Sequence, residues 1–333
     1  MDDMQTWLSL IFAGLMGLAI LIYVCLDGYD LGVGILFARA KDDEKDRMIA
    51  SIGPFWDANE TWLVLSIGIL LVAFPTAYGT ILSTLYLPVA VMLIGLILRG
   101  VAFEFRAKVK AERKGTWNRL FFCGSLAVAL AQGFMLGLYI MGLKFTAATV
   151  LFACLTAICL SIGYAFVGAT WLVLKMEGDL QHRAIRWARG ALGFVAIGFG
   201  AISAASPLVS PRIFDKWFTM PAMAYLAPLP IVALILLVWL WRKLGRLYAA
   251  PEQGAWRPFL GAVGVFVLAF AGLAYSFYPY IVPDQLTIYE KTTAPESLMF
   301  MLIGALIVLP FIIGYTVYAY WVFRGKATQL RYD

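Results

Sequence analysis

The sequence is poor in the residues that build most catalytic centres. It has one histidine, His182, and four cysteines, none in a C-x-x-C or zinc-ligand spacing. It contains no phosphate-binding glycine loop, no Rossmann fingerprint and no Ser-His-Asp set. A membrane-embedded b-type haem usually takes histidine or methionine ligands from facing helices. The chain cannot supply a bis-histidine site, so we predict that it binds no cofactor and performs no redox or covalent chemistry alone.

Charge is scarce as well. Only 14% of the 333 residues are charged and 62% are hydrophobic, whereas soluble domains carry roughly a quarter charged residues. We predict an all-α polytopic membrane protein with one integral-membrane domain over 1–333. Apolar runs of about 20 residues can cross a bilayer as helices. The nine expected spans lie near 8–36, 51–73, 79–101, 117–140, 148–174, 188–206, 222–242, 257–277 and 298–322.

The net charge of +6 is explained by topology. Of the 26 lysines and arginines, 22 fall in alternate connections and the C-terminal tail, and four fall in the other set. The positive-inside rule therefore places the N-terminus outside and the C-terminus in the cytoplasm. The basic excess is topogenic, and we expect no nucleic-acid partner. The start, Met1-Asp2-Asp3-Met4, lacks the basic residues of a secretory signal, so no cleaved leader is expected.

Against this apolar background, carboxylates within the predicted spans stand out. Asp27 and Asp30 lie near the cytoplasmic end of the first span, and Asp57 and Glu60 lie two or three turns into the second. A charged side chain inside a bilayer costs several kcal/mol on insertion scales. Each pair is spaced i, i+3 and so shares a helix face. With Glu104 at the end of the third span, these acids indicate a path that is open from the cytoplasm.

A purely structural interpretation explains the same residues. Asp30 or Asp57 could pair with Arg99 or Arg106 as an interhelical ion pair, and Glu104 could be a solvated or paired surface acid. The residues alone leave this interpretation and the proton path open.

Neighbouring residues add smaller signals. Trp56 is read most simply as a packing or interface aromatic, and Asn59 could hold water between the acids. Gln132 in the fourth span is expected to form an interhelical hydrogen bond. Gly28 and Gly32 form a small-xxx-small pair, which lets a neighbouring helix approach closely.

Three motifs, in order, resemble subunit II of the cytochrome bd-type quinol oxidases. They are Asp-Gly-Tyr-Asp-Leu-Gly-Val-Gly at 27–34, Pro-Phe-Trp-Asp-Ala-Asn-Glu-Thr-Trp-Leu at 54–63 and Arg-Gly-Val-Ala-Phe-Glu-Phe-Arg at 99–106. The resemblance covers the whole chain in length and helix count. The short outer loops look more like the cyanide-insensitive branch.

The resemblance implies a bacterial inner-membrane complex that oxidises quinol and reduces oxygen to water with cytoplasmic protons. Charge separation then builds the proton-motive force. Haems b and d, or b in place of d, belong to the partner subunit I, and subunit II is its haem-free counterpart. The further partners that the resemblance suggests are a structural quinone, a small single-helix subunit and lipid. No motif here identifies a quinone site.

The resemblance also assigns roles to residues. Trp56 and Asp57 match the family's candidate proton relay, and Glu104 matches its candidate cytoplasmic entrance. Tyr332 matches a family tyrosine loosely. The remaining candidates for the proton path are Asn59, Glu60, Asp27 and Asp30. Two alternatives are kept: a proton-coupled secondary transporter, which would favour inverted repeats, and a purely structural scaffold subunit.

Overall fold

The computed structural model describes residues 3–251 and 253–327, and within these ranges the chain is almost entirely helical. Among the described residues, nine helical segments are long and apolar enough to cross a membrane. Their helices are α1 (Asp3–Leu36), α3 (Trp56–Ala73), α5 (Tyr86–Lys108), α6 (Lys114–Ile140), α7 (Ala147–Lys175), α8 (Gly178–Val209), α11 (Pro228–Ala249), α12 (Trp256–Phe277) and α13 (Pro295–Val322). The predicted all-α membrane fold is confirmed.

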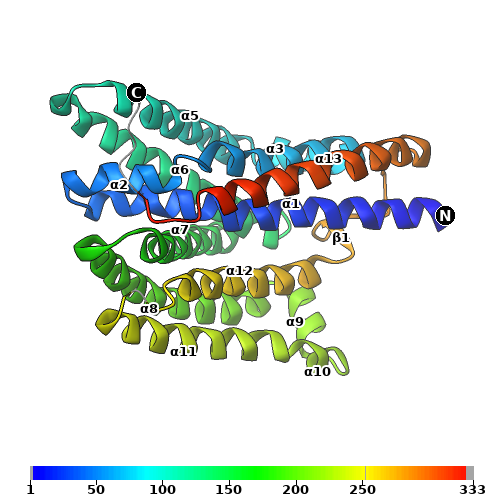
Figure 1. Cartoon of the computed structure of the whole chain (residues 1–333). Coiled ribbons are helices and arrows are strands. Elements are labelled where there is room, and N and C mark those ends of the chain that lie inside the picture. The colour runs from blue at the N-terminus through cyan, green and yellow to red at the C-terminus, as the bar shows by residue number, and fades with distance from the viewer. Residues whose placement is uncertain (1–2, 252, 328–333) are drawn as a thin grey trace.

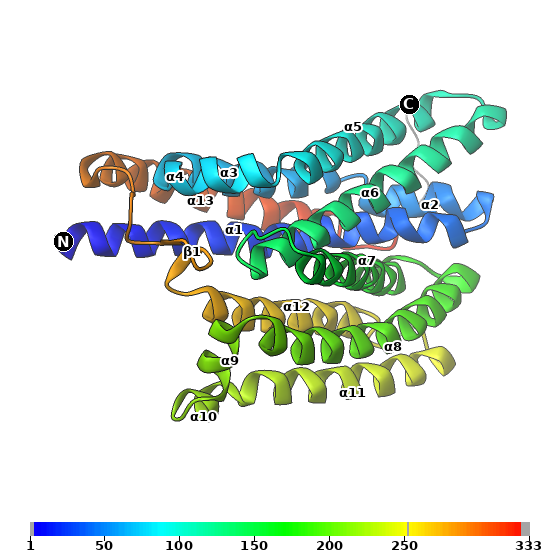
Figure 2. The same cartoon turned by 180° about the vertical axis from the view of Figure 1, so that it is seen from behind.

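The long helices form a bundle around α1 and α7 (Figures 1 and 2). On one side of this central pair lie α3, α5 and α13, and on the other lie α8, α11 and α12. Helix α6 packs against both α5 and α7, and α12 packs against both α7 and α11. Helix α13 is the least enclosed, since Leu298 is its only buried residue.

The two ends of the bundle differ in composition. One end, here called the basic end, carries the connections that follow α1, α5, α7 and α11, which hold most of the lysines and arginines. The N-terminus of α1 and the two-stranded sheet lie at the opposite end (Figure 1). The shorter elements are η1 (Phe37–Arg39), α2 (Asp42–Ile52), α4 (Pro75–Thr84), η2 (Ala111–Arg113), α9 (Pro211–Phe218), α10 (Ala222–Leu226), β1 (Tyr280–Val282) and β2 (Leu286–Thr287).

Several predicted spans differ from the helices observed. The third, expected over 79–101, is divided at Leu85 between α4, which ends at Thr84, and α5, which begins at Tyr86 and continues to Lys108. The second span was expected from 51, but α2 ends at Ile52 and α3 begins only at Trp56. Gly53 keeps helical dihedrals, but Pro54 has no N–H to donate to the preceding turn and Phe55 leaves the helical region, which explains the break after Gly53. Asp57 therefore lies in the first turn of α3, not two or three turns inside. Helix α8 begins at Gly178, ten residues before its apolar run, so His182, which lies between the predicted spans, is helical.

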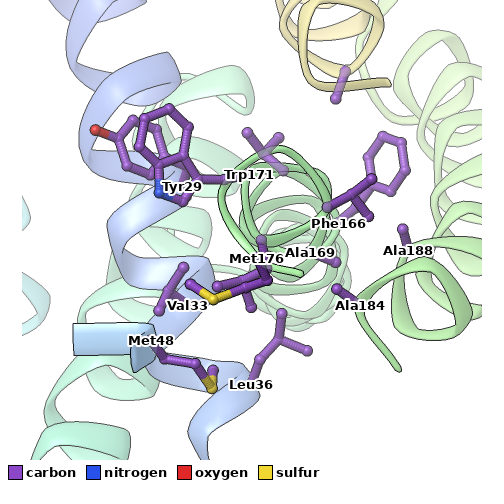
Figure 3. Packing of buried hydrophobic residues seen from close by; sticks show 14 of the residues in the cluster. Tyr29, Val33, Leu36, Met48, Phe166, Ala169, Trp171, Met176, Ala184 and Ala188 are labelled. Atoms are coloured by element: carbon purple, nitrogen blue, oxygen red, sulfur yellow. The ribbon is translucent and has the colours of Figure 1, made fainter. Parts of the chain in front are cut away.

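The core is centred on α7, whose side chains contact α1, α2 and α8 (Figure 3). Tyr29 of α1 stacks on Trp171 of α7, with ring centroids 4.2 Å apart. Close approach of α1 and α7 depends on Gly28 and Gly32, which face the Tyr164 segment as their spacing predicted. The core residues labelled in Figure 3 are Tyr29, Val33, Leu36, Met48, Phe166, Ala169, Trp171, Met176, Ala184 and Ala188.

Helix α2 is fastened across the basic end by ion pairs. Asp46 contacts Arg106 Nη1 at 2.6 Å and Lys114 Nζ at 3.2 Å, which joins α2 to α5 and α6. Glu44 pairs with Arg183 of α8 at 3.0 Å. Partial burial alone would raise the pKa of Asp46, but the hydrogen bonds and charges of Arg106 and Lys114 outweigh it and hold that pKa below its usual value.

This arrangement predicts a pH dependence of stability. A carboxylate with a lowered pKa in the folded state stabilises the fold above its unfolded pKa of about 3.9, and the contribution is lost as pH falls through the folded value. We expect Asp46→Asn to remove part of the loss of stability below about pH 4. Thermal denaturation between pH 6 and pH 3 would measure it. Asp42→Asn removes a fully exposed carboxylate that pairs with Lys45. It should change the pH dependence of the melting temperature less than Asp46→Asn does. An equal fall of the melting temperature with pH in wild type and Asp46→Asn would contradict the prediction.

Candidate functional site

A buried ion pair joins α1 to α5 near the basic end. Asp27 Oδ1 lies 2.6 Å from Arg99 Nη2, and the two side chains are 0% and 1% exposed. The guanidinium also lies 5.8 Å from the ring centre of Trp56 on α3. The predicted interhelical ion pair thus exists, but Asp27 forms it and not Asp30 or Asp57. Arg106 pairs instead with Asp46 on α2, outside the spans.

One turn further along α1, a hydrogen-bonded cluster joins three helices. The Asn59 amide of α3 donates to Asp30 Oδ2 at 2.8 Å and to the Tyr29 hydroxyl at 2.9 Å. Tyr320 of α13 donates to Asn59 Oδ1 at 3.1 Å, and its hydroxyl lies 2.5 Å from that of Tyr29. Asp30 and Asn59 are buried. This cluster attaches the otherwise exposed α13 to the bundle.

The two buried acids are only half satisfied. Asp27 Oδ2 and Asp30 Oδ1 are buried and have no hydrogen-bond partner among the residues of 3–251 and 253–327. Arg99 Nε and Nη1 share this property within the same ranges. A buried charged group retains a hydrogen-bonding requirement, so these atoms are available to a proton or to a further polar group.

A second polar contact lies further from the basic end. Gln132 of α6 donates to the Tyr23 hydroxyl at 2.5 Å and accepts from the Tyr164 hydroxyl at 2.8 Å. Its predicted interhelical hydrogen bond is confirmed, and it links α6 to both α1 and α7.

The proposed relay residues lie at the start of α3. Trp56 packs on Phe103 of α5, with ring centroids 4.9 Å apart. Asp57 is exposed and forms no ion pair within the described part of the chain. Glu60 is half-buried and lies within electrostatic reach of Arg99, Asp27 and Asp57. The acids of α3 therefore extend from the exposed surface of the bundle towards the buried ion pair.

Glu104 lies on α5, next to the residue that packs on Trp56. It is exposed, follows Phe103 in α5, and contacts Lys108 at 3.7 Å. Phe103, which precedes Glu104, contacts Trp56, which precedes Asp57, so α3 and α5 approach each other at this level. Tyr332 lies outside the described residues.

Sequence reasoning missed Tyr320 and the partner of Asp27. The run containing Tyr320 also holds Tyr315 and Tyr318, which are exposed, and nothing local distinguishes the one that faces α1. Arg99 stands 72 residues from Asp27, so their pairing depends on how α1 and α5 pack. The signal available in the sequence was that Arg99 lies inside an apolar span, where an arginine needs a carboxylate partner on a neighbouring helix.

The single histidine lies on α8 at the basic end. Its ring meets Tyr248 of α11 edge to face, with centroids 5.6 Å apart. A bis-histidine haem site needs a second histidine on a facing helix, and the sequence contains none. The residues of this chain therefore do not fit a haem of that kind.

Comparison with known proteins identifies the family. The family model for cytochrome bd terminal oxidase subunit II matches residues 8–323. Cytochrome bd ubiquinol oxidase subunit 2 of Bacillus subtilis is 30% identical over 91% of this chain and 92% of its own length. Cytochrome bd-I ubiquinol oxidase subunit 2 of Escherichia coli is 27% identical over 95% and 94%.

The fold agrees with this result. A chain of the bd oxidase from Geobacillus thermodenitrificans superposes with a TM-score of 0.76, at 17% identity, over 95% of this chain and 98% of that one. Nine apolar helices and the matched family make this a multi-pass protein of the bacterial inner membrane. The chain belongs to the cytochrome bd terminal oxidase subunit II family.

Proposed function

We propose that this chain stabilises the haem-bearing subunit I of its quinol oxidase and helps to deliver cytoplasmic protons to the oxygen-reduction site. The observation that carries the proposal is Asp57, a carboxylate in a membrane span that is exposed on the surface of the chain. The haems of subunit I would supply the oxygen chemistry. Family membership favours this role over that of a secondary transporter.

The exposed face of α3 supports a protein partner there. Asp57 and Thr61 share this face with Val64, which is 68% exposed, and with Leu71, which is 46% exposed. A carboxylate in contact with lipid would be unfavourable by several kcal/mol, whereas at a protein interface it can meet polar groups or water. We therefore place subunit I against the face formed by α3, α5 and α13.

The acids behind this face divide into two roles. Arg99 holds Asp27 in a buried ion pair, so we assign Asp27 a positioning role between α1 and α5. Asp57 is free of such a partner within the described ranges, and Glu60 lies one turn further along the same helix. In our proposal protons enter from the basic end beside Glu104 and reach Asp57, whose carboxylate passes them to subunit I. Asp30, hydrogen-bonded to Asn59, can hold a proton beside this path.

Asp57→Asn tests the proposal. The amide keeps the size of the side chain but cannot take up and release a proton at this position. A positioned proton-transfer group typically contributes about 10²–10⁴ in rate, so we expect turnover to fall by at least about tenfold while the haem spectrum stays normal. The measurement is quinol-driven oxygen uptake by the purified complex, with absorption spectra of the same samples.

Asp43→Asn is the matched control, because Asp43 is an exposed acid of α2 at the same end of the bundle. It should leave turnover unchanged. Full turnover in Asp57→Asn with normal haems would contradict the relay role and leave the scaffold role. Loss of haem in Asp57→Asn would instead mean that this side chain holds the two subunits together.

A further inference from the structure

The basic ends of α8, α11 and α12 meet on the side of the bundle away from α3, α5 and α13 (Figures 1 and 2). Five cationic side chains gather there. Arg242, Arg246 and Arg257 are exposed, and Arg189 and Lys243 are half-buried. We propose that this group, here called the arginine cluster, binds the headgroup of an anionic phospholipid. The proposal does not depend on the proton path.

Contacts between the three helices hold the cluster together. The Arg189 guanidinium of α8 lies 5.0 Å from the ring centre of Trp241, and a side chain at Gly245 would lie 4.0 Å from its Cζ. Lys243 Nζ donates to the Gln253 carbonyl at 2.9 Å, in the connection between α11 and α12. Lys243 is also within electrostatic reach of Arg246 and Arg257.

The cluster has an unusual charge balance. Within the described residues, none of its five cations forms an ion pair with a carboxylate. Glu252 is the only acid in the sequence between 216 and 283, and it lies outside the described residues. Arg189 Nε is buried without a hydrogen-bond partner in those same ranges. Cations held together in this way favour an anion with several acceptor oxygens, and a phosphodiester fits that description.

The surface beside the cluster favours a lipid over a soluble phosphate. Exposed apolar residues follow one face of α11 towards the arginines: Ile231 at 52%, Ile235 at 63% and Val238 at 53% exposed. Their spacing of three and four residues continues to Arg242 and Arg246, so one stripe changes from apolar to cationic at its basic end. Acyl chains would lie along the apolar part with the phosphate at the arginines.

Aromatic residues mark the same level of the bundle. Trp241 and Trp256 are 47% and 51% exposed, and each lies next to an arginine of the cluster in the sequence. Tryptophan is enriched where a membrane meets water. The arginine cluster therefore sits at the depth of lipid headgroups, where basic groups between helices bind anionic lipids.

The test is lipid binding to the purified oxidase complex, with dioleoyl-phosphatidylglycerol titrated and the tightly bound lipid followed by native mass spectrometry. A variant with Arg242→Gln, Arg246→Gln and Arg257→Gln removes three exposed charges. Each basic residue near an anionic lipid contributes a factor of about five, so we expect affinity to fall on the order of a hundredfold. Dioleoyl-phosphatidylcholine, which has no net charge, should bind weakly to both proteins.

A matched control removes the same charge elsewhere on the basic end. Lys110→Gln, Arg113→Gln and Arg119→Gln replace three exposed cations of the α5–α6 region, and should lower affinity by less than about fivefold. If the complex with the three cluster substitutions does not assemble, Arg246→Gln and Arg257→Gln singly should each lower affinity about fivefold.

Equal phosphatidylglycerol affinity in wild type and the cluster variants would overturn the proposal. An equal loss in the control variant would also overturn it, because the effect would then follow net charge and not the cluster. Inorganic phosphate separates the two sources of the anion. If phosphate displaces the lipid at equal concentration, the site is one for a soluble anion and the lipid proposal is wrong.

Discussion

Arg99→Met is expected to lower the free energy of unfolding of this chain by about 3–5 kcal/mol, because it leaves a buried carboxylate without its counter-charge. Arg99 and Asp27 are 1% and 0% exposed and lie 2.6 Å apart. Asp30 is buried one turn away, with Asn59 as its amide donor. Removing the Arg99 guanidinium would therefore leave two adjacent buried acids without the cation that now pairs with one of them.

Pulse proteolysis of the purified complex in increasing denaturant would measure the effect, since the intact chain can be followed on a gel separately from subunit I. Lys108→Met is the control. Its pair with Glu104 is 3.7 Å long and exposed on both sides, and exposed pairs contribute about 0–1 kcal/mol.

A double substitution separates the pair from its parts. Replacing both members of a buried ion pair by neutral residues is often close to neutral, whereas removing one is not. Asp27→Asn combined with Arg99→Met should therefore be less destabilised than Arg99→Met alone, by about 1–3 kcal/mol. Equal stability of the single and double variants would show that Arg99 acts through packing and not through Asp27.

The sequence predicted the spans well because hydrophobic length is a local property. The sequence was a weaker guide to where helices begin and end outside the apolar runs. Helix α8 begins ten residues before its apolar run, because a segment rich in charged residues can also form a helix outside the membrane. The break between α2 and α3 was predictable from Gly53-Pro54. Use of this signal would have placed Asp57 in the first turn of its helix.

The candidate site was predictable in its members but not in its pairings. Polar residues in apolar runs pointed to Asp27, Asp30, Asp57 and Asn59. Which of them is buried depends on the rotation of each helix and on its neighbours. Asp30 and Asn59 face each other across α1 and α3, while Asp57, two residues before Asn59, faces outwards. Helical rotation of about 100° per residue separates these two environments.

The packing of α1 on α7 gives the second large effect. A Cβ at Gly32 would lie 1.8 Å from the Tyr164 carbonyl oxygen and 2.9 Å from the Gly168 nitrogen. These are backbone atoms, so no side chain can rotate to relieve the clash. Gly32→Ala is therefore expected to destabilise the chain by about 3 kcal/mol, at the upper end of the usual effect of overpacking. Gly168→Ala meets the backbone of Gly32 and Val33 at 2.5 Å and should behave alike.

Gly14→Ala in the same helix provides the matched control, since no atom outside its own helix lies within 4 Å of the added Cβ. It should leave stability unchanged or raise it by up to about 1 kcal/mol, because alanine is the better helix former. Pulse proteolysis again separates this chain from its partner. If Gly32→Ala proved as stable as Gly14→Ala, α1 and α7 could move apart freely. The residues that α1 carries at this crossing, Asp27 and Asp30, would then not be held in place by the contact with α7. A loss confined to Gly32 and Gly168 instead makes this helix crossing the support that fixes both acids relative to Arg99 and Asn59.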